Sequence, residues 1–268
     1  MKRILTIQDI SCAGRCSTSL ALPVLSAMGI ECVVLPTQIL STHTLFPQPV
    51  RLDLSDFARQ TLRHWQQVGL SFDGILIGYL GGENQLALAQ EAVDLFRREG
   101  CPLIVDPAMA DHGRLYGSID PGFPLAMARL CRKADLLLPN ITEACLLTGT
   151  AYSTQPALQA LAGKLLDLGV GAVMITGAQT QPDSTGFYYR SGDDEYIHQV
   201  PMLSRSSHGT GDLFAAVTAG ALLRGESAVE AGIRAAQFIC DALEATPEIT
   251  PYGVHFEKVL HTLKQPSP

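Results

Sequence analysis

Short apolar runs alternate along this chain with longer amphipathic stretches, and no other feature of the sequence limits the possible folds as strongly. Such alternation is typical of β-α-β units, in which helices cover both faces of a mainly parallel sheet. Most of the apolar runs are unbroken Val, Ile and Leu, as expected of strands that are buried on both faces. We therefore predict strands at residues 4–8, 32–35, 74–77, 103–105, 136–138 and 172–175, and helices at residues 17–28, 54–68, 84–98, 123–132, 142–147 and 156–168.

The C-terminal third follows a different pattern. Residues 187–190 and 195–200, separated by the turn sequence SGDD, predict an antiparallel hairpin at the edge of the sheet. Helices are expected at residues 211–223, 227–243 and 254–263, and the last four residues, QPSP, are expected to be frayed. No low-complexity linker or fixed-period repeat interrupts the chain. We therefore predict an α/β fold in a single domain, residues 1–268.

Composition excludes several classes of protein. With 47% hydrophobic and 17% charged residues, the chain is not of the disordered type. Its net charge is −7 and its basic residues form no long run, which disfavours nucleic acid and anionic membranes as partners. No apolar stretch approaches the roughly 18 residues of a membrane span, and the opening residues turn polar after ILTI. Seven cysteines without paired spacing are expected to be reduced thiols, which predicts a cytoplasmic protein.

Polar side chains are concentrated where the predicted strands end. In an open parallel sheet, ligands bind outside the carboxyl ends of the strands, so these side chains are expected to meet at one rim. They are Asp9 and Ser11 after the first strand, Thr44 after the second, Tyr79 after the third, Asp106 after the fourth, Asn140 and Glu143 after the fifth, and Thr176 after the sixth.

The segment SHGTGD, residues 207–212, is the sharpest local motif. Gly209 and Gly211 flank Thr210 just before a small-residue helix, so the backbone can approach a ligand closely and the free N–H groups at the helix start can bind an anion. Asp212 then lies beside that anion, where its carboxylate could accept a proton from an attacking hydroxyl. The same residues also suit a turn and a helix macrodipole without any function, and the motif alone leaves both interpretations open.

Asn140 and Glu143 likewise allow two interpretations. Asn at an N-cap with Glu three residues later is a variant of the capping box, while Glu143 could instead hold a hydrated Mg²⁺ near nucleotide phosphates. Asp106, which precedes Pro107, is either a turn former at a strand end or a second acidic partner of that metal. The phosphate-loop motif GxxxxGK[ST] does not occur, which argues against the kinases that carry it.

Six blocks of sequence resemble the ribokinase-like kinases and, among them, the pyridoxal (vitamin B6) kinases. The blocks are ILTIQ, LPTQILSTHT, IGYLGG, VDPAM, PNITE and HGTGD, and together they cover nearly the whole chain. PNITE and HGTGD are shared by the wider superfamily and imply only phosphoryl transfer from ATP, whereas STHT and GYLGG point to the pyridoxal branch. Sugar kinases of the superfamily carry a GG-containing segment near the N-terminus, and the corresponding CAGRCSTS lacks it.

The resemblance implies a fold, a reaction and roles for individual residues. The fold would be ribokinase-like, and the reaction would transfer the γ-phosphoryl group of Mg-ATP to the 5′-hydroxymethyl group of pyridoxal, pyridoxine or pyridoxamine. A homodimer and assistance by a monovalent cation are also implied. By resemblance Asp212 is the catalytic base, Gly209, Thr210 and Gly211 form the anion hole, Asp106, Asn140 and Glu143 lie near the metal and phosphates, Thr176 lies on the nucleotide side, and Thr44 and Tyr79 line the pyridine pocket.

Two positions depart from the family pattern. Asp9 stands where many relatives have Ser, at the position that faces the ring nitrogen in the family, and a carboxylate there would favour a protonated pyridinium. Alternatively, Ser11 makes that contact and Asp9 has another role. Leu138 stands where some relatives have a polar residue, so one nucleotide contact is expected to be missing.

Two other functions compete with vitamer phosphorylation. One is a kinase for hydroxymethylpyrimidine, which has a similar ring and the same reactive hydroxymethyl group. The other is a vitamer-binding protein without turnover, against which the intact Asp212 beside Gly-Thr-Gly argues.

Overall fold

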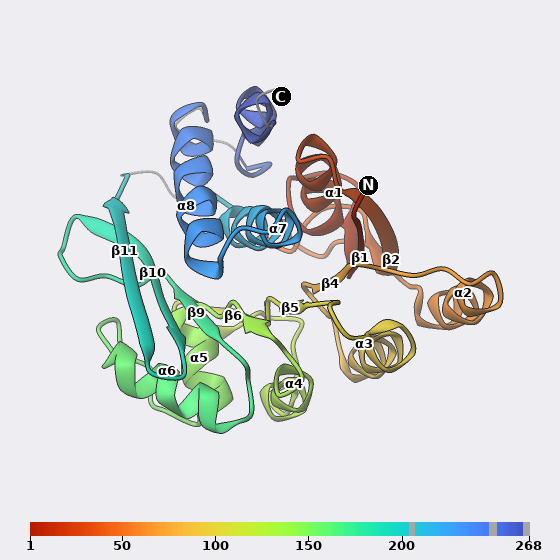
Figure 1. The fold of residues 1–268 in the computed structure, drawn as a ribbon, viewed down its shortest axis with the longest axis horizontal. Helices are drawn as coiled ribbons and strands as arrows, with labels where there is room; N and C mark the ends of the chain where they lie inside the picture. The colour runs from red at the N-terminus through yellow and green to blue at the C-terminus, as the bar shows by residue number, and fades with distance from the viewer. Residues whose placement is uncertain (204–206, 247–250, 265–268) are drawn as a thin grey trace.

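A nine-stranded sheet in the order β11-β10-β9-β8-β5-β4-β1-β2-β3 forms the centre of the molecule (Figure 1). The structure is a computed structural model that describes residues 1–203, 207–246 and 251–264. Neighbouring strands from β2 across to β9 pair in parallel, whereas β3, β10 and β11 pair antiparallel. The strands of this sheet are β1 (Arg3–Ser11), β2 (Glu31–Leu40), β3 (Arg51–Asp53), β4 (Gly74–Ile77), β5 (Leu103–Val105), β8 (Leu136–Leu137), β9 (Val173–Thr176), β10 (Ser184–Ser191) and β11 (Asp194–Pro201).

Helices cover both faces of this sheet (Figure 1). One face carries α1 (Ser17–Ala27), α7 (Thr210–Leu223) and α8 (Ala228–Glu244), while the other carries α2 (Ser55–Gln67), α3 (Glu83–Phe96), α4 (Phe123–Cys131), α5 (Ile141–Thr148) and α6 (Leu158–Asp167). The predicted α/β architecture with helices on both faces is therefore confirmed. Within the described ranges, no helix combines the length and the apolar composition that a membrane crossing requires.

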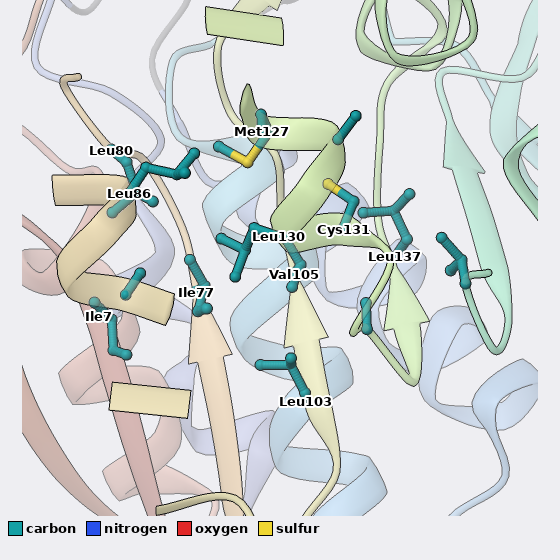
Figure 2. Packing of buried hydrophobic residues seen from close by; sticks show 14 of the residues in the cluster. Ile7, Ile77, Leu80, Leu86, Leu103, Val105, Met127, Leu130, Cys131 and Leu137 are labelled. Atoms are coloured by element: carbon teal, nitrogen blue, oxygen red, sulfur yellow. The ribbon is translucent and has the colours of Figure 1, made fainter. Parts of the chain in front are cut away.

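Strand β5 shows why its sequence is an unbroken apolar run. Leu103 and Val105 pack into the hydrophobic core on the side of α3 and α4, where Met127 and Leu130 lie above them (Figure 2). Ile104 points the other way, into the core formed with α1, α7 and α8. Because alternate side chains of a strand face opposite sides, a strand covered on both sides must be apolar throughout.

The predicted C-terminal hairpin is confirmed as the antiparallel pair β10 and β11 at the edge of the sheet. The prediction of one helix at residues 254–263 is wrong. Two short 3-10 helices, η1 (Phe256–Lys258) and η2 (Leu260–Leu263), replace it. His255, with φ −84° and ψ 63°, and Val259, with φ −112° and ψ 2°, depart from α-helical geometry, so the segment is divided into two short turns. The tail QPSP lies outside the described residues.

Three further strands were not predicted, and several of the predicted strands, β1, β2 and β10 among them, are longer than expected. The edge strand β3 and the small hairpin of β6 (Ala110–Asp111) and β7 (Arg114–Leu115) are too short and too polar to show a strand pattern. Strand β1 continues past residue 8 to Ser11, and β2 continues past residue 35 to Leu40. Asp9 and Ser11 therefore lie within the end of β1 and not after it.

Candidate active site

A pocket opens at the carboxyl ends of β1, β2 and β4, beside the start of α7. Five residues predicted for the site line it, namely Asp9, Ser11, Thr44, Tyr79 and Asp212. They come from β1, from the loops after β2 and β4, and from the first turn of α7. The structure thus brings together every residue predicted to bind the substrate with the one predicted to act as base.

Two carboxylates, those of Asp9 and Asp212, face this pocket, and the charge of Arg51 offsets the burial of Asp9 only in part. Asp9 is 2% exposed; its Oδ2 accepts a hydrogen bond from Ser11 Oγ at 3.3 Å, and its Oδ1 is buried with no partner. Burial raises the pKa of the Asp9 carboxyl. Burial and, secondarily, the charge of Asp9 raise the pKa of Asp212 to about 7. Since no Lys or Arg is among the described residues that line the pocket, the pocket favours a ligand that brings its own positive charge.

Gly209, Thr210 and Gly211, which we call the anion loop, lie at the start of α7 beside this pocket. Gly209 is the N-cap residue, with φ 92°, and a Cβ there would lie 2.3 Å from the carbonyl oxygen of Arg15. Only glycine fits this position. A Cβ at Gly211 would meet nothing within 4 Å, so the loop has open space beside it. Free N–H groups at a helix start next to open space can bind the oxygens of a phosphate group.

A second acidic group lies next to the pocket, at the ends of β5 and β8. Burial, followed by the charges of Glu143 and Asp212, raises the pKa of Asp106 well above its ordinary value. Burial also raises the pKa of Glu143 to about 7. Such mutual repulsion is relieved when a cation binds nearby. Even so, the described residues contain no group of three or more His, Cys, Asp or Glu side chains arranged to hold a metal ion.

The capping box predicted as one interpretation of Asn140 and Glu143 is present. Asn140 Oδ1 accepts from Glu143 N, and Glu143 Oε2 accepts from Asn140 N, both at 2.9 Å. Glu143 Oε1 accepts from the backbone N–H groups of Met109 at 3.0 Å and Ala110 at 3.5 Å. Both carboxylate oxygens therefore bind backbone N–H groups and hold the β6–β7 hairpin against α5. The metal-binding role of Glu143 stays a prediction.

We expect Glu143→Gln to lower the melting temperature, by the equivalent of about 1–3 kcal/mol, because the amide NH₂ would face backbone donors that have no other acceptor. The concentration of Mg²⁺ needed for activity should stay the same. Thermal unfolding and Mg²⁺ titrations check this expectation. Glu230→Gln is the matched control, since Ser227 and Glu230 form the same capping box at the exposed start of α8, and it should show a smaller loss. A rise in the Mg²⁺ requirement with an unchanged melting temperature would instead make Glu143 a metal ligand.

Asn140 and Thr176, both predicted for the nucleotide side, lie beside each other outside the pocket. They form a parallel bridge between the segment that follows β8 and the end of β9. Asn140 Nδ2 donates to the carbonyl of Ala110 at 2.8 Å, which ties this corner to the β6–β7 hairpin. Thr176 Oγ1 donates to the carbonyl of Pro139 at 3.5 Å.

Several pocket residues escaped the sequence analysis. Ser17 begins α1 with φ 46°, an uncommon conformation for a residue other than glycine, and its backbone N–H donates to the Asp212 carboxylate. Its place at the start of the first predicted helix was its only signal. Cys16 also lines the pocket, and burial raises the pKa of its thiol far above the ordinary value. Tyr116, after the unpredicted β6–β7 hairpin, was missed as well. His43 and His208, which neighbour the predicted Thr44 and Gly209 in the sequence, also line the pocket.

Comparisons with known proteins agree with this geometry. Residues 22–256 match the model of a family described as phosphomethylpyrimidine kinase. A pyridoxine/pyridoxal/pyridoxamine kinase of Bordetella bronchiseptica is 31% identical over 262 residues, which cover 91% of this chain and 89% of that protein.

Two solved structures are similar throughout. A Bacteroides thetaiotaomicron protein described as a phosphomethylpyrimidine kinase, in a crystal form with pyridoxal, shows 34% identity and a TM-score of 0.93, covering 99% of this chain and 96% of that one. The Staphylococcus aureus pyridoxal kinase in complex with AMP-PCP and pyridoxal shows 25% identity and a TM-score of 0.81, covering 95% of this chain and 92% of that one.

Proposed function

Because the chain belongs to the phosphomethylpyrimidine kinase family, we propose that it transfers the γ-phosphoryl group of Mg-ATP to the 5′-hydroxymethyl group of a vitamin B6 vitamer. The resemblance to pyridoxal kinases is confirmed, and the chain is a phosphotransferase of the pyridoxal kinase type. The B6 vitamer as acceptor and the roles of individual residues are the proposal. We further propose that residues 1–268 act as one kinase domain.

The environment of Asp212 is the main support for this proposal. Asp212 combines a place in the pocket, a position immediately after the anion loop and a pKa of about 7. A general base works best when its pKa lies near the working pH, since it is then ionised and still basic enough to accept a proton. Ordinary aspartates, with a pKa near 4, are poorer bases for an alcohol.

In the proposed reaction each group has one task. The vitamer ring lies between Asp9 and Tyr79, with its hydroxymethyl group toward Asp212. Asp212 accepts the hydroxyl proton as the oxygen attacks the γ-phosphorus, and ADP leaves on the side of Asn140 and Thr176. The N–H groups of the anion loop stabilise the negative charge of the transferring phosphoryl group. The side chain of Tyr79 is held in place by a hydrogen bond between its hydroxyl and Ser118 Oγ, 2.9 Å apart.

Magnesium fits the acidic group beside the pocket, where Asp106 carries an elevated pKa next to two other carboxylates. Asp106 would hold the ion, directly or through water, because the oxygens of Glu143 are already bound to backbone N–H groups. A bound magnesium ion neutralises charge on the nucleotide phosphates.

The orphaned Oδ1 of Asp9 supports a contact with the ring nitrogen. If one proton is shared between this carboxylate and the ring, the affinity for pyridoxine should fall about tenfold per pH unit once both groups are deprotonated in the free state. Asp9→Ser should flatten this dependence without abolishing phosphorylation, since the reacting hydroxyl lies near Asp212. Binding titrations without nucleotide between pH 7.5 and 9, as assay conditions, measure it. Ser11→Ala is the companion variant: identical profiles for wild type and Asp9→Ser would make Ser11 the residue that contacts the ring.

Phosphorylation of hydroxymethylpyrimidine is the second candidate, because the family is described as a phosphomethylpyrimidine kinase and the two compounds share the pyrimidine ring. A panel of pyridoxal, pyridoxine, pyridoxamine and hydroxymethylpyrimidine with Mg-ATP separates the two. The proposal requires a higher kcat/KM for at least one vitamer than for the pyrimidine. The reverse order would assign the chain to hydroxymethylpyrimidine, and no ATP consumption with any of the four would contradict both.

A further inference from the structure

The imidazole of His43 connects parts of the chain that are far apart in sequence. The residue is 1% exposed, its Nε2 lies 2.7 Å from the carbonyl oxygen of Pro251, and Leu45 N donates to its Nδ1 at 3.3 Å. A carbonyl only accepts hydrogen bonds and a backbone N–H only donates them, so Nε2 carries the hydrogen and Nδ1 carries none. Both ring nitrogens are therefore occupied by backbone groups of the protein.

Residues 251–254, the C-terminal strap, lie between two loops of the active site. Tyr252 O accepts from Arg15 N at 2.8 Å, and Val254 N donates to His208 O at 3.1 Å. Gly253, with φ +91°, brings the strap so close that a Cβ would lie 2.9 Å from Arg15 O and 3.0 Å from His208 O. The strap is thus fastened to the loop before α1 and to the residue that precedes the anion loop.

The His43 ring is enclosed by its neighbours. Its centroid lies 4.6 Å from that of His208 and 4.8 Å from that of Phe46. On another side, a Cβ at Gly14 would lie 2.2 Å from His43 Cδ2, so the backbone there touches the ring edge. His208 directly precedes Gly209, and a displacement of the His43 ring would therefore be transmitted to the anion loop.

We propose that His43 is a positioning residue, which fixes the anion loop against the vitamer pocket through the C-terminal strap and the ring of His208. The role rests on the proposed function, since the reaction needs the phosphoryl group and the vitamer hydroxyl held in register. A displacement of about 1 Å in such a site can lower a rate by about 100-fold. His43 acts here through its neighbours and not on the reacting atoms.

Two substitutions separate the two hydrogen bonds of the His43 ring, one to Pro251 and one from Leu45. His43→Asn keeps an acceptor for Leu45 N, as in an Asx-turn, but is too short to reach Pro251. His43→Gln places an amide donor near the position of Nε2. We expect the Asn variant to lower kcat about 10- to 100-fold with KM values changed less than about threefold, and the Gln variant to recover most of kcat. His64→Asn, on the exposed side of α2, is the matched control and should behave as wild type.

Hydrogen exchange on the intact protein tests the connection without any substrate. The amides of Arg15 and Val254 should exchange faster in His43→Asn than in wild type or His43→Gln. A raised vitamer KM with unchanged kcat would overturn the proposal by making His43 a direct substrate contact, and so would unchanged exchange in the Asn variant. If wild type phosphorylates no vitamer, the proposed function fails, while the exchange comparison still decides whether His43 holds the strap.

Discussion

Replacing Asp212 with Asn is expected to lower turnover by about 10²- to 10⁴-fold while the affinity for ATP changes little. Asn keeps the size and much of the hydrogen bonding of Asp but cannot accept the hydroxyl proton. In wild type, turnover should rise with pH through about 7, where the Asp212 carboxyl ionises. Steady-state kinetics across this range check both expectations. Turnover near that of wild type in the variant would remove Asp212 from the role of base.

The same variant should not be less stable at neutral pH. Because the folded-state pKa of Asp212 is raised from 3.8 to about 7, the folded protein binds more protons than the unfolded chain between these values. The free energy of unfolding contributed by this group therefore falls as pH rises from about 4 to about 7. Asp212→Asn removes this loss, so its melting temperature relative to wild type should increase over that pH range. A variant that is inactive and also less stable at pH 8 would indicate a structural role instead.

Gly209→Ala is expected to reduce both activity and stability. The left-handed backbone conformation at this position costs about 1–2 kcal/mol for a residue with a Cβ, and the added methyl group would lie 2.3 Å from the carbonyl oxygen of Arg15. One of the two segments must move. Since the anion loop would be displaced from its position beside Asp212, turnover should fall by about 100-fold. Kinetics and thermal unfolding of the purified variant measure the two effects.

Gly225 provides a close control for this substitution. It has the same φ of +92°, but a Cβ there would meet nothing within 4 Å, and the residue lies beyond the other end of α7. Gly225→Ala should therefore show the conformational cost alone, with normal turnover. If the two alanine variants lose the same stability and both keep their turnover, the contact with Arg15 does not position the anion loop.

The sequence predicts the parallel core and the identity of the pocket residues well, because both depend on local patterns. Unbroken apolar runs indicate buried strands, and polar residues at the strand ends indicate the rim, which is why Asp9, Ser11 and Thr44 were predicted to lie together. Asp212 was predicted from the motif at the start of a helix, and its role as base from the resemblance. Ser17 and Tyr116 were missed, since a positive φ and a short hairpin leave no periodic pattern. The contacts between His43 and the C-terminal strap were also beyond prediction, because they join residues more than 200 positions apart, as the separation of 208 for His43 and Pro251 shows.

The protonated thiol of Cys16 has a chemical consequence for the proposed binding of an aldehyde vitamer. The aldehyde of pyridoxal reacts readily with amines and with thiolates, so an enzyme that handles it can be trapped as an adduct with its own substrate. No Lys is among the described residues that line the pocket, and the one Cys among them, Cys16, has a thiol pKa raised far above the ordinary value. A thiol that stays protonated is a poor nucleophile. The described lining therefore offers no reactive amine or thiolate to a carbonyl group, and under the proposed function an aldehyde vitamer should leave the pocket modified only at its hydroxyl.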